Sequence, residues 1–159
     1  MSDVPPRVLV AEDEEHLGLL VAHFLRGRGL DVTLERDGTA AVARMTAETF
    51  DVALVDVQMP GLDGLAVLAR AQALPRPPEV IVATGNGAAE AVVAALRGGA
   101  YDAVAKPYRM AEVELLVRRA AEKRWLRDEV AALRAELARI QAERSSSSPR
   151  PVRPCRPGH

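Results

Sequence analysis

The sequence contains few aromatic residues: its 159 residues include one tryptophan, two tyrosines and two phenylalanines. Hydrophobic residues nevertheless make up 48% of the chain. A hydrophobic core therefore has to be built mainly from valine, leucine and alanine. A chain of this length can form one domain of ordinary size with an appendage.

The chain has only one cysteine, Cys155, which excludes a disulfide framework within it. No charged-then-apolar leader opens the sequence, so we expect a protein of the reducing cytoplasm. No apolar run approaches the roughly 18 residues of a membrane span, and we expect no membrane association. The 21 basic and 22 acidic residues nearly cancel, which argues against direct binding of nucleic acid.

Short apolar segments alternate with helical patterns along the chain. We predict strands at 7–13, 31–35, 51–56, 79–84 and 102–106, and helices at 14–29, 38–48, 64–74, 88–100 and from 110 to about 142. Gly98 and Gly99 are expected to stop the fourth helix. Asp37 and Asp63 are expected to cap the helices that follow them. The segment 51–56 is apolar without alternation, as expected when helices cover both faces of a sheet. The pattern therefore predicts an α/β fold with a doubly wound parallel sheet.

Chemically reactive side chains end the predicted strands, where open parallel sheets bind their ligands. They are Glu12, Asp13, Asp56, Thr84 and Lys106. The three carboxylates would repel one another, and a hard divalent cation such as Mg²⁺ would neutralise them. A carboxylate beside Mg²⁺, with a lysine and a hydroxyl nearby, is suited to forming an acyl phosphate.

Each of these residues also has an ordinary explanation when it is taken alone. Glu12 and Asp13 suit a solvated turn before a helix, Thr84 a strand end and Lys106 an exposed surface. Their joint occurrence at one edge of a sheet favours a phosphoryl-acceptor site, with Asp56 as the acceptor.

Four motifs surround these residues: Glu12–Glu14 (EDE), Asp56–Gly64 (DVQMPGLDG), Ala83–Gly85 (ATG) and Gly99–Tyr108 (GAYDAVAKPY). Any one of them alone would be a weak signal. Together, in this order and spacing, they resemble the receiver domain of two-component response regulators over about residues 5–124. The resemblance implies a flavodoxin-like sheet of five strands in the order 2-1-3-4-5.

The resemblance also implies the chemistry of the site. Asp56 would receive a phosphoryl group from a histidine of a partner sensor kinase. Mg²⁺ would be held by Asp13, Asp56 and the backbone of Gln58, with Glu12 acting through water. Such a domain catalyses its own phosphorylation and dephosphorylation and is not a conventional turnover enzyme.

Two further residues receive roles from the resemblance. Lys106 would pair with the phosphoryl oxygens, and Thr84 would shift to hydrogen-bond them, which would couple the chemistry to the fourth helix and fifth strand. The bond between Lys106 and Pro107 is a candidate cis peptide. The family usually has an aromatic residue three positions before this lysine, where the chain has Ala103. Tyr101 either takes that role or packs beside the fourth helix.

The last helical pattern extends past the expected end of the domain. Five of its apolar residues follow a 4-3 spacing: Leu126, Val130, Leu133, Leu137 and Ile140. They form a seam of about two heptads that suits a coiled-coil homodimer, and the alternative is a helix that packs back on its own domain. We expect a receiver domain at 1–124, a helical extension at 125–143 and a disordered tail at 144–159.

The motif at 99–108 and the long last helix resemble receivers of the nitrogen-regulation type of transcriptional activator, although the sequence has no Gly-x-x-x-x-Gly-Lys loop of an attached ATPase domain. The leading hypothesis is a Mg²⁺-dependent phosphoacceptor switch that controls self-association or binding of a downstream protein. A second is a constitutive scaffold or dimerisation module with a receiver fold, which Ala103 favours. A third, a phosphatase with Asp56 as nucleophile, is disfavoured because no substrate-covering cap domain would fit.

Overall fold

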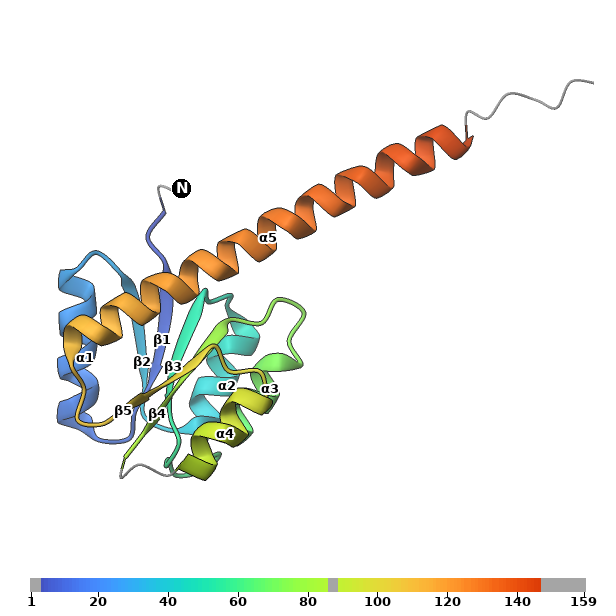
Figure 1. The fold of residues 1–159 in the computed structure, drawn as a ribbon. Coiled ribbons are helices and arrows are strands. Elements are labelled where there is room, and N and C mark those ends of the chain that lie inside the picture. Colours follow the sequence, from blue (N-terminus) through green and yellow to red (C-terminus); the bar gives the residue numbers. More distant parts are fainter. Residues whose placement is uncertain (1–3, 86–88, 147–159) are drawn as a thin grey trace, which may run out of the picture. The chain divides into compact units, whose positions relative to one another are not determined.

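A five-stranded parallel sheet with strand order β2-β1-β3-β4-β5 forms the centre of the fold (Figure 1). The computed structural model describes residues 4–85 and 89–146. The strands are β1 (Arg7–Ala11), β2 (Asp31–Glu35), β3 (Val52–Asp56), β4 (Glu79–Thr84) and β5 (Asp102–Ala105). The helices are α1 (Glu15–Gly27), α2 (Gly38–Ala47), α3 (Gly64–Gln72), α4 (Ala89–Arg97) and α5 (Met110–Ser146). The predicted flavodoxin-like, doubly wound fold with a long last helix is confirmed.

The boundaries differ from the predictions at several element ends. β1 ends at Ala11, two residues before its predicted end. α4 ends at Arg97, directly before the expected stop at Gly98 and Gly99, and Gly99 takes a φ of 98°, a left-handed conformation that ends helices. α5 continues to Ser146, so 144–146 are helical and the expectation of a disordered tail from 144 is wrong for these three residues. The rest of that tail, with Cys155, lies outside the described residues.

Both predicted helix caps are present. The side chain of Asp37 accepts a hydrogen bond from the backbone N–H of Ala40 at 2.7 Å. Asp63 accepts one from the backbone N–H of Ala66 at 2.8 Å. Each carboxylate thus satisfies an N–H group that has no partner inside its helix. The two caps set where α2 and α3 begin.

The sheet separates two hydrophobic cores. Val8 and Val10 of β1 belong to the core beneath α1 and α5, whereas Leu9 and Ala11 belong to the core beneath α2, α3 and α4. Figure 1 shows these two groups of helices on opposite sides of the sheet. All residues of β3 and β4 are buried. Such strands need no polar alternation because helices cover both faces. The buried hydrophobic residues are mostly valine, leucine and alanine, as the composition predicts.

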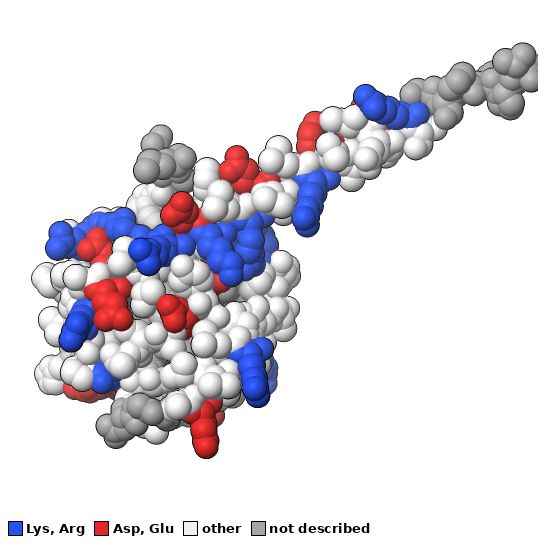
Figure 2. Space-filling view, in the orientation of Figure 1, with Lys and Arg blue, Asp and Glu red and all other residues white. Residues whose placement is uncertain are grey.

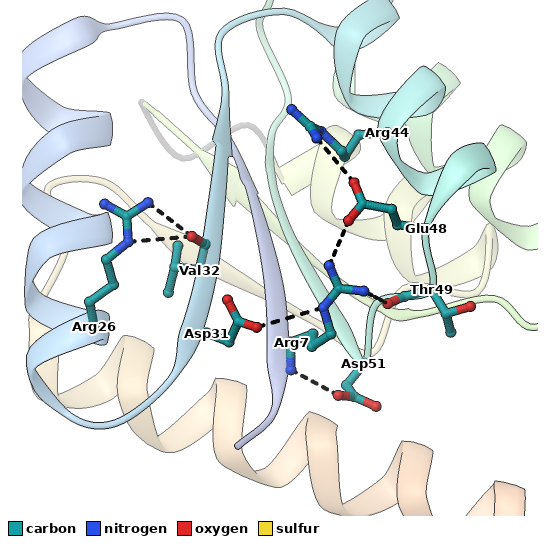
Figure 3. Close-up of polar contacts among 8 residues, drawn as sticks. All are labelled: Arg7, Arg26, Asp31, Val32, Arg44, Glu48, Thr49 and Asp51. Carbon is teal, nitrogen blue, oxygen red and sulfur yellow. Dashed lines mark hydrogen bonds and ion pairs between the residues drawn. The ribbon is translucent and has the colours of Figure 1, made fainter. Parts of the chain in front are cut away.

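A polar network holds the amino-terminal edge of the sheet around Arg7 (Figure 3). The guanidinium donates to Glu48 Oε1 at 2.8 Å and to the carbonyl of Thr49 at 2.9 Å. The backbone N–H of Arg7 donates to Asp51 Oδ2 at 2.8 Å, and the guanidinium carbon lies 4.8 Å from the centre of the Phe50 ring. These contacts tie the start of β1 to the connection between α2 and β3.

The chain divides into two compact units, Met1–Trp125 and Leu126–His159. At the end of the first unit, the side chain of Arg124 is almost fully buried. Its guanidinium donates to the carbonyl of Arg76 at 3.2 Å and to that of Pro77. Arg124 thereby anchors this part of α5 to the connection between α3 and β4. In the described part of the chain, no helix is long and apolar enough to cross a membrane.

Candidate functional site

The candidate site lies where the strands end at their carboxyl edge. Asp56 is the last residue of β3 and Thr84 the last of β4. Glu12 directly follows β1 and Lys106 directly follows β5. The parallel register brings these ends together, because β3 pairs with both β1 and β4 and β4 pairs with β5. The order of the strands therefore places residues that are far apart in the sequence at one edge.

The ammonium group of Lys106 bridges two carboxylates. Its Nζ donates to Oε1 and Oε2 of Glu12 at 2.7 and 2.9 Å, and to Oδ2 of Asp56 at 2.7 Å. Glu12 is 2% exposed and Asp56 6% exposed. Hydrogen bonds between charged groups are stronger than neutral ones, and burial reduces their screening. Lys106 therefore fixes the positions of both carboxylates.

One cation faces three carboxylates here. Oxygen atoms of Glu12, Asp13 and Asp56 lie within 4.8 Å of one another, and Asp13 is exposed. Burial raises the pKa of Glu12 to about 7; the hydrogen bond from Lys106 opposes this shift and the charge of Asp56 adds to it. Burial acts to lower the pKa of Lys106, but its bonds to Asp56 and Glu12 prevail and raise it. The cluster retains an excess of negative charge that suits a divalent cation.

Backbone groups of the connection between β3 and α3 complete the surroundings of Asp56. The N–H of Gln58 donates to Asp56 Oδ1 at 3.1 Å. An open hollow of about 490 Å³ adjoins the carboxylates and is lined by Asp13, Val57, Gln58, Met59 and Asp63. The hollow leaves this side of the site open to solvent.

Gly64 is a structural residue of the site that sequence reasoning did not single out. A Cβ at this position would lie 2.4 Å from the carbonyl oxygen of Asp56 and 2.7 Å from Cα of Val57. The N–H of Gly64 donates to the carbonyl of Val57 at 2.8 Å. The start of α3 therefore lies directly against the backbone that carries Asp56. A glycine eight residues after the end of a predicted strand is a weak signal by itself.

Tyr108 is a second residue that sequence reasoning missed, although it ends the motif at 99–108. It follows the peptide bond between Lys106 and Pro107, which is cis as expected. Lys106 Nζ lies 5.7 Å from the centre of the Tyr108 ring, within the range of a cation–π contact. Burial and the charges of Glu12 and Asp56 raise the pKa of Tyr108. The ring covers Lys106 as an uncharged apolar surface.

The residues expected to transmit a signal lie on β4, on β5 or directly before β5. Thr84 is 4% exposed, and its carbonyl accepts a hydrogen bond from the backbone N–H of Lys106 at 2.8 Å. Ala103 lies in β5 opposite Val82 of β4. Tyr101 packs against the core on the α1 and α5 side, with Lys123 Nζ 5.6 Å from its ring centre. Tyr101 thus joins the core beneath α1 and α5.

Comparison with known proteins gives one family match and many relatives. A family model described as the response regulator receiver domain matches residues 8–118. The chain is 34% identical over 129 residues to the C4-dicarboxylate transport transcriptional regulatory protein DctD of Rhizobium meliloti. It is 34% identical over 113 residues to the DNA-binding transcriptional regulator NtrC of Salmonella typhimurium. The aligned parts cover 81% and 71% of this chain, but only 28% and 24% of those relatives.

Solved structures give the same result. NtrX from Brucella abortus superposes with a TM-score of 0.74 at 32% identity, covering 81% of this chain and 29% of that one. The receiver domain of the Francisella response regulator 1452 superposes with a TM-score of 0.70 at 26% identity, covering 74% of this chain and 98% of that one. The similarity therefore includes a whole receiver domain and the corresponding part of longer regulators.

Proposed function

The chain belongs to the family of response regulator receiver domains, and from this premise we propose that its Asp56 is the phosphoryl acceptor of a two-component signalling switch. Receiver domains are phosphoacceptor signalling domains that sensor histidine kinases phosphorylate. The observation that carries the proposal is the bridge from Lys106 to Asp56 at 2.7 Å, beside Glu12 and Asp13.

The proposed reaction transfers a phosphoryl group from a phosphohistidine of the kinase. A carboxylate oxygen of Asp56 forms a bond to phosphorus while the bond from phosphorus to the imidazole nitrogen breaks, and the imidazole then takes up a proton. The negative charge on Asp56 is available because Lys106 stabilises it. The ammonium already lies beside the acceptor and can pair with the oxygens of the incoming group, which is the electrostatic part of catalysis.

The donor set fits Mg²⁺. Asp13, Asp56 and the backbone carbonyl of Gln58 would hold the ion, and Glu12 would act through a water molecule. Mg²⁺ prefers oxygen ligands, keeps several waters and takes only one or two direct carboxylates. Of the three clustered carboxylates, the proposal uses two, Asp13 and Asp56, as direct ligands. When bound, the ion supplies positive charge that neutralises the carboxylates and the phosphoryl oxygens.

The proposed output begins at Thr84. Its hydroxyl would move to hydrogen-bond the phosphoryl group, and β4 would pass this change to α4 and β5. Such a change biases an equilibrium between two forms of a surface. We propose that the altered surface changes self-association through the C-terminal helix or binding of a downstream protein. Because the relatives include transcriptional regulators, we propose that the altered surface acts on a regulatory domain, either attached or on a separate protein. We place this switch in the cytoplasm.

Ala103 supports a second candidate function. Receivers of this family usually place an aromatic ring at this position, whereas this chain has only a methyl group. The second candidate is a constitutive scaffold that keeps the receiver fold without the phosphorylation-dependent output. The two differ in a measurable way, because a scaffold has the same oligomeric state before and after phosphorylation.

The intact mass of the protein after incubation with a small phosphodonor and Mg²⁺ tests the proposal. The wild type should gain one phosphoryl group, and Asp56→Asn should gain none. Asp63→Asn is the matched control, because it removes a neighbouring carboxylate while asparagine can still cap α3; it should be phosphorylated like the wild type. Omitting Mg²⁺ should abolish the gain. A wild type that gains no mass, with the donor or with a panel of sensor kinases, would contradict the proposal.

A further inference from the structure

The C-terminal segment of α5 (residues 126–146) carries a row of exposed apolar side chains. Their exposed fractions range from 40 to 64%: Leu126, Val130, Leu133, Leu137 and Ile140. Large aliphatic side chains are seldom left exposed in such an ordered row without a function in association. Spacings of four, three, four and three residues keep all five on one side of a helix.

The spacing fixes the heptad register of the segment. Leu126, Leu133 and Ile140 occupy d positions, and Val130 and Leu137 occupy a positions. A β-branched residue at a with leucine at d, as in Val130 and Leu133, favours two strands, whereas leucine at a with isoleucine at d, as in Leu137 and Ile140, favours higher oligomers. The seam residues alone therefore do not set the number of strands, which sedimentation equilibrium measures. The register also places the charged residues that flank the seam.

The charged residues that flank the seam differ between its two sides. The g positions, which precede each a position, all carry glutamate: Glu129, Glu136 and Glu143. The e positions, which follow each d position, carry no acid: Arg127, Arg134 and Gln141. Along the segment, Figure 2 shows both acidic and basic side chains between uncharged surfaces. One side of the seam is thus acidic, and the other is basic or neutral.

This separation distinguishes the two ways in which a pair of identical helices can align. In a parallel pair, each g residue faces the e residue five positions further along the partner, so Glu129 faces Arg134 and Glu136 faces Gln141 of the second copy. In an antiparallel pair, g faces g and e faces e, which brings glutamates against glutamates. Opposite charges attract and like charges repel at these distances. The charges favour the parallel arrangement.

The outer face of the segment supports its helical state. Five of the outward b, c and f positions are alanine, the strongest helix former: Ala131, Ala132, Ala135, Ala138 and Ala142. Arg139 at a c position pairs with Glu136 of its own helix at 2.7 Å. The intrinsic helix propensity reduces the entropy lost on pairing, which matters because the seam covers only about two heptads.

We propose that the C-terminal segment pairs with the same segment of a second copy of this chain as a parallel, in-register, two-stranded coiled coil. The proposal rests on the self-association in the proposed function and adds its partner, orientation and register. A parallel pair brings the two Trp125–Leu126 junctions side by side. Two phosphoryl-acceptor sites would then belong to one symmetric dimer, and the short seam makes that dimer sensitive to small changes in free energy.

Engineered cysteines at the two ends of the seam test the orientation. Leu126→Cys and Ile140→Cys are made separately in a Cys155→Ser background and oxidised under mild conditions. In a parallel pair each variant crosslinks to itself in full yield. In an antiparallel pair position 126 lies near position 140, so crosslinks form only when the two variants are mixed. Crosslinking restricted to the mixture, or no crosslinking in either variant, would overturn the proposal.

Charge reversals test the pairing across the seam, with the dimer dissociation constant measured by sedimentation equilibrium. Arg134→Glu or Glu129→Arg should raise the constant about tenfold, because each puts like charges opposite one another twice per dimer. The double variant should return to within about threefold of the wild type. Arg139→Glu, the same charge change at an outward position, is the matched control and should leave the constant nearly unchanged. A double variant no better than either single variant would contradict the assigned register.

Phosphorylation is measured on every one of these proteins by intact mass. All substitutions lie in residues 126–146 or at Cys155, so each should gain one phosphoryl group as the wild type does. Loss of pairing with intact phosphorylation would count against the coiled coil alone. Pairing without phosphorylation in the wild type would leave the coiled coil standing and contradict the proposed function.

Discussion

Replacing Lys106 by methionine removes the ammonium group that bridges Glu12 and Asp56 and keeps a side chain of similar length. Two carboxylates that are 2% and 6% exposed then lose a partner at 2.7 Å each. Deleting one member of a buried ion pair costs about 3–5 kcal/mol, because the remaining charge stays buried without compensation. The replacement should therefore destabilise the metal-free domain.

The expected loss is smaller than this range for a specific reason. Glu12 already has a pKa raised to about 7, so it takes up a proton more readily once Lys106 is absent, and this relieves part of the cost. We expect a net loss of about 2–3 kcal/mol in the free energy of unfolding near neutral pH. For a domain of this size, that loss lowers Tm by about 10 °C.

Thermal unfolding followed by circular dichroism, in a chelator and again in excess Mg²⁺, provides the assay. Mg²⁺ should stabilise Lys106→Met more than the wild type, since the cation takes over the neutralising role. Arg36→Met is the matched control: this side chain is 61% exposed and its partner Glu15 is 56% exposed, so a loss of about 1 kcal/mol or less is expected. A metal-free Lys106→Met protein as stable as the wild type would refute the reasoning.

Three further predictions follow from the contacts of the site and of the α2 cap. Gly64→Ala should cost about 1–3 kcal/mol in urea unfolding, because its Cβ would meet the carbonyl of Asp56 at 2.4 Å. Gly27→Ala, where nothing lies within 4 Å of the added atom, should instead be neutral or stabilising by up to about 1 kcal/mol. Asp13→Asn should weaken Mg²⁺ binding about tenfold or more in a calorimetric titration, and equal affinity would remove Asp13 from the proposed ligands. Asp37→Ala should cost about 1 kcal/mol, since a cap is lost, whereas an unchanged midpoint would show that the bond to Ala40 contributes nothing.

The fold was accessible from the sequence because its signals are local and periodic. The uninterrupted apolar run from Val52 to Val55 predicts a strand covered on both faces, and all of β3 is buried. Asp37 and Asp63 precede helical patterns and do cap their helices. The end of α5 was less predictable, because several residues near it are compatible with helix.

The candidate site was predictable in its residue types but not in its contacts. The strand order brings Glu12 and Lys106 together, yet the bridge between them joins residues 94 positions apart and depends on side-chain conformations that no local pattern encodes. The close approach of Gly64 to Asp56 is equally non-local. From the sequence, Arg124 would be expected to be exposed like the other charged residues of this helix. In the structure its side chain is buried against backbone carbonyls.

The most direct test of the central claim is to locate the phosphoryl group in the chain. Reduction of the acyl phosphate with borohydride converts the modified aspartate to homoserine, and peptide mass spectrometry then identifies the position. Homoserine is expected at position 56 alone, after treatment with a phosphodonor and Mg²⁺. Homoserine at another acidic residue, with Asp56 unmodified, would contradict the claim.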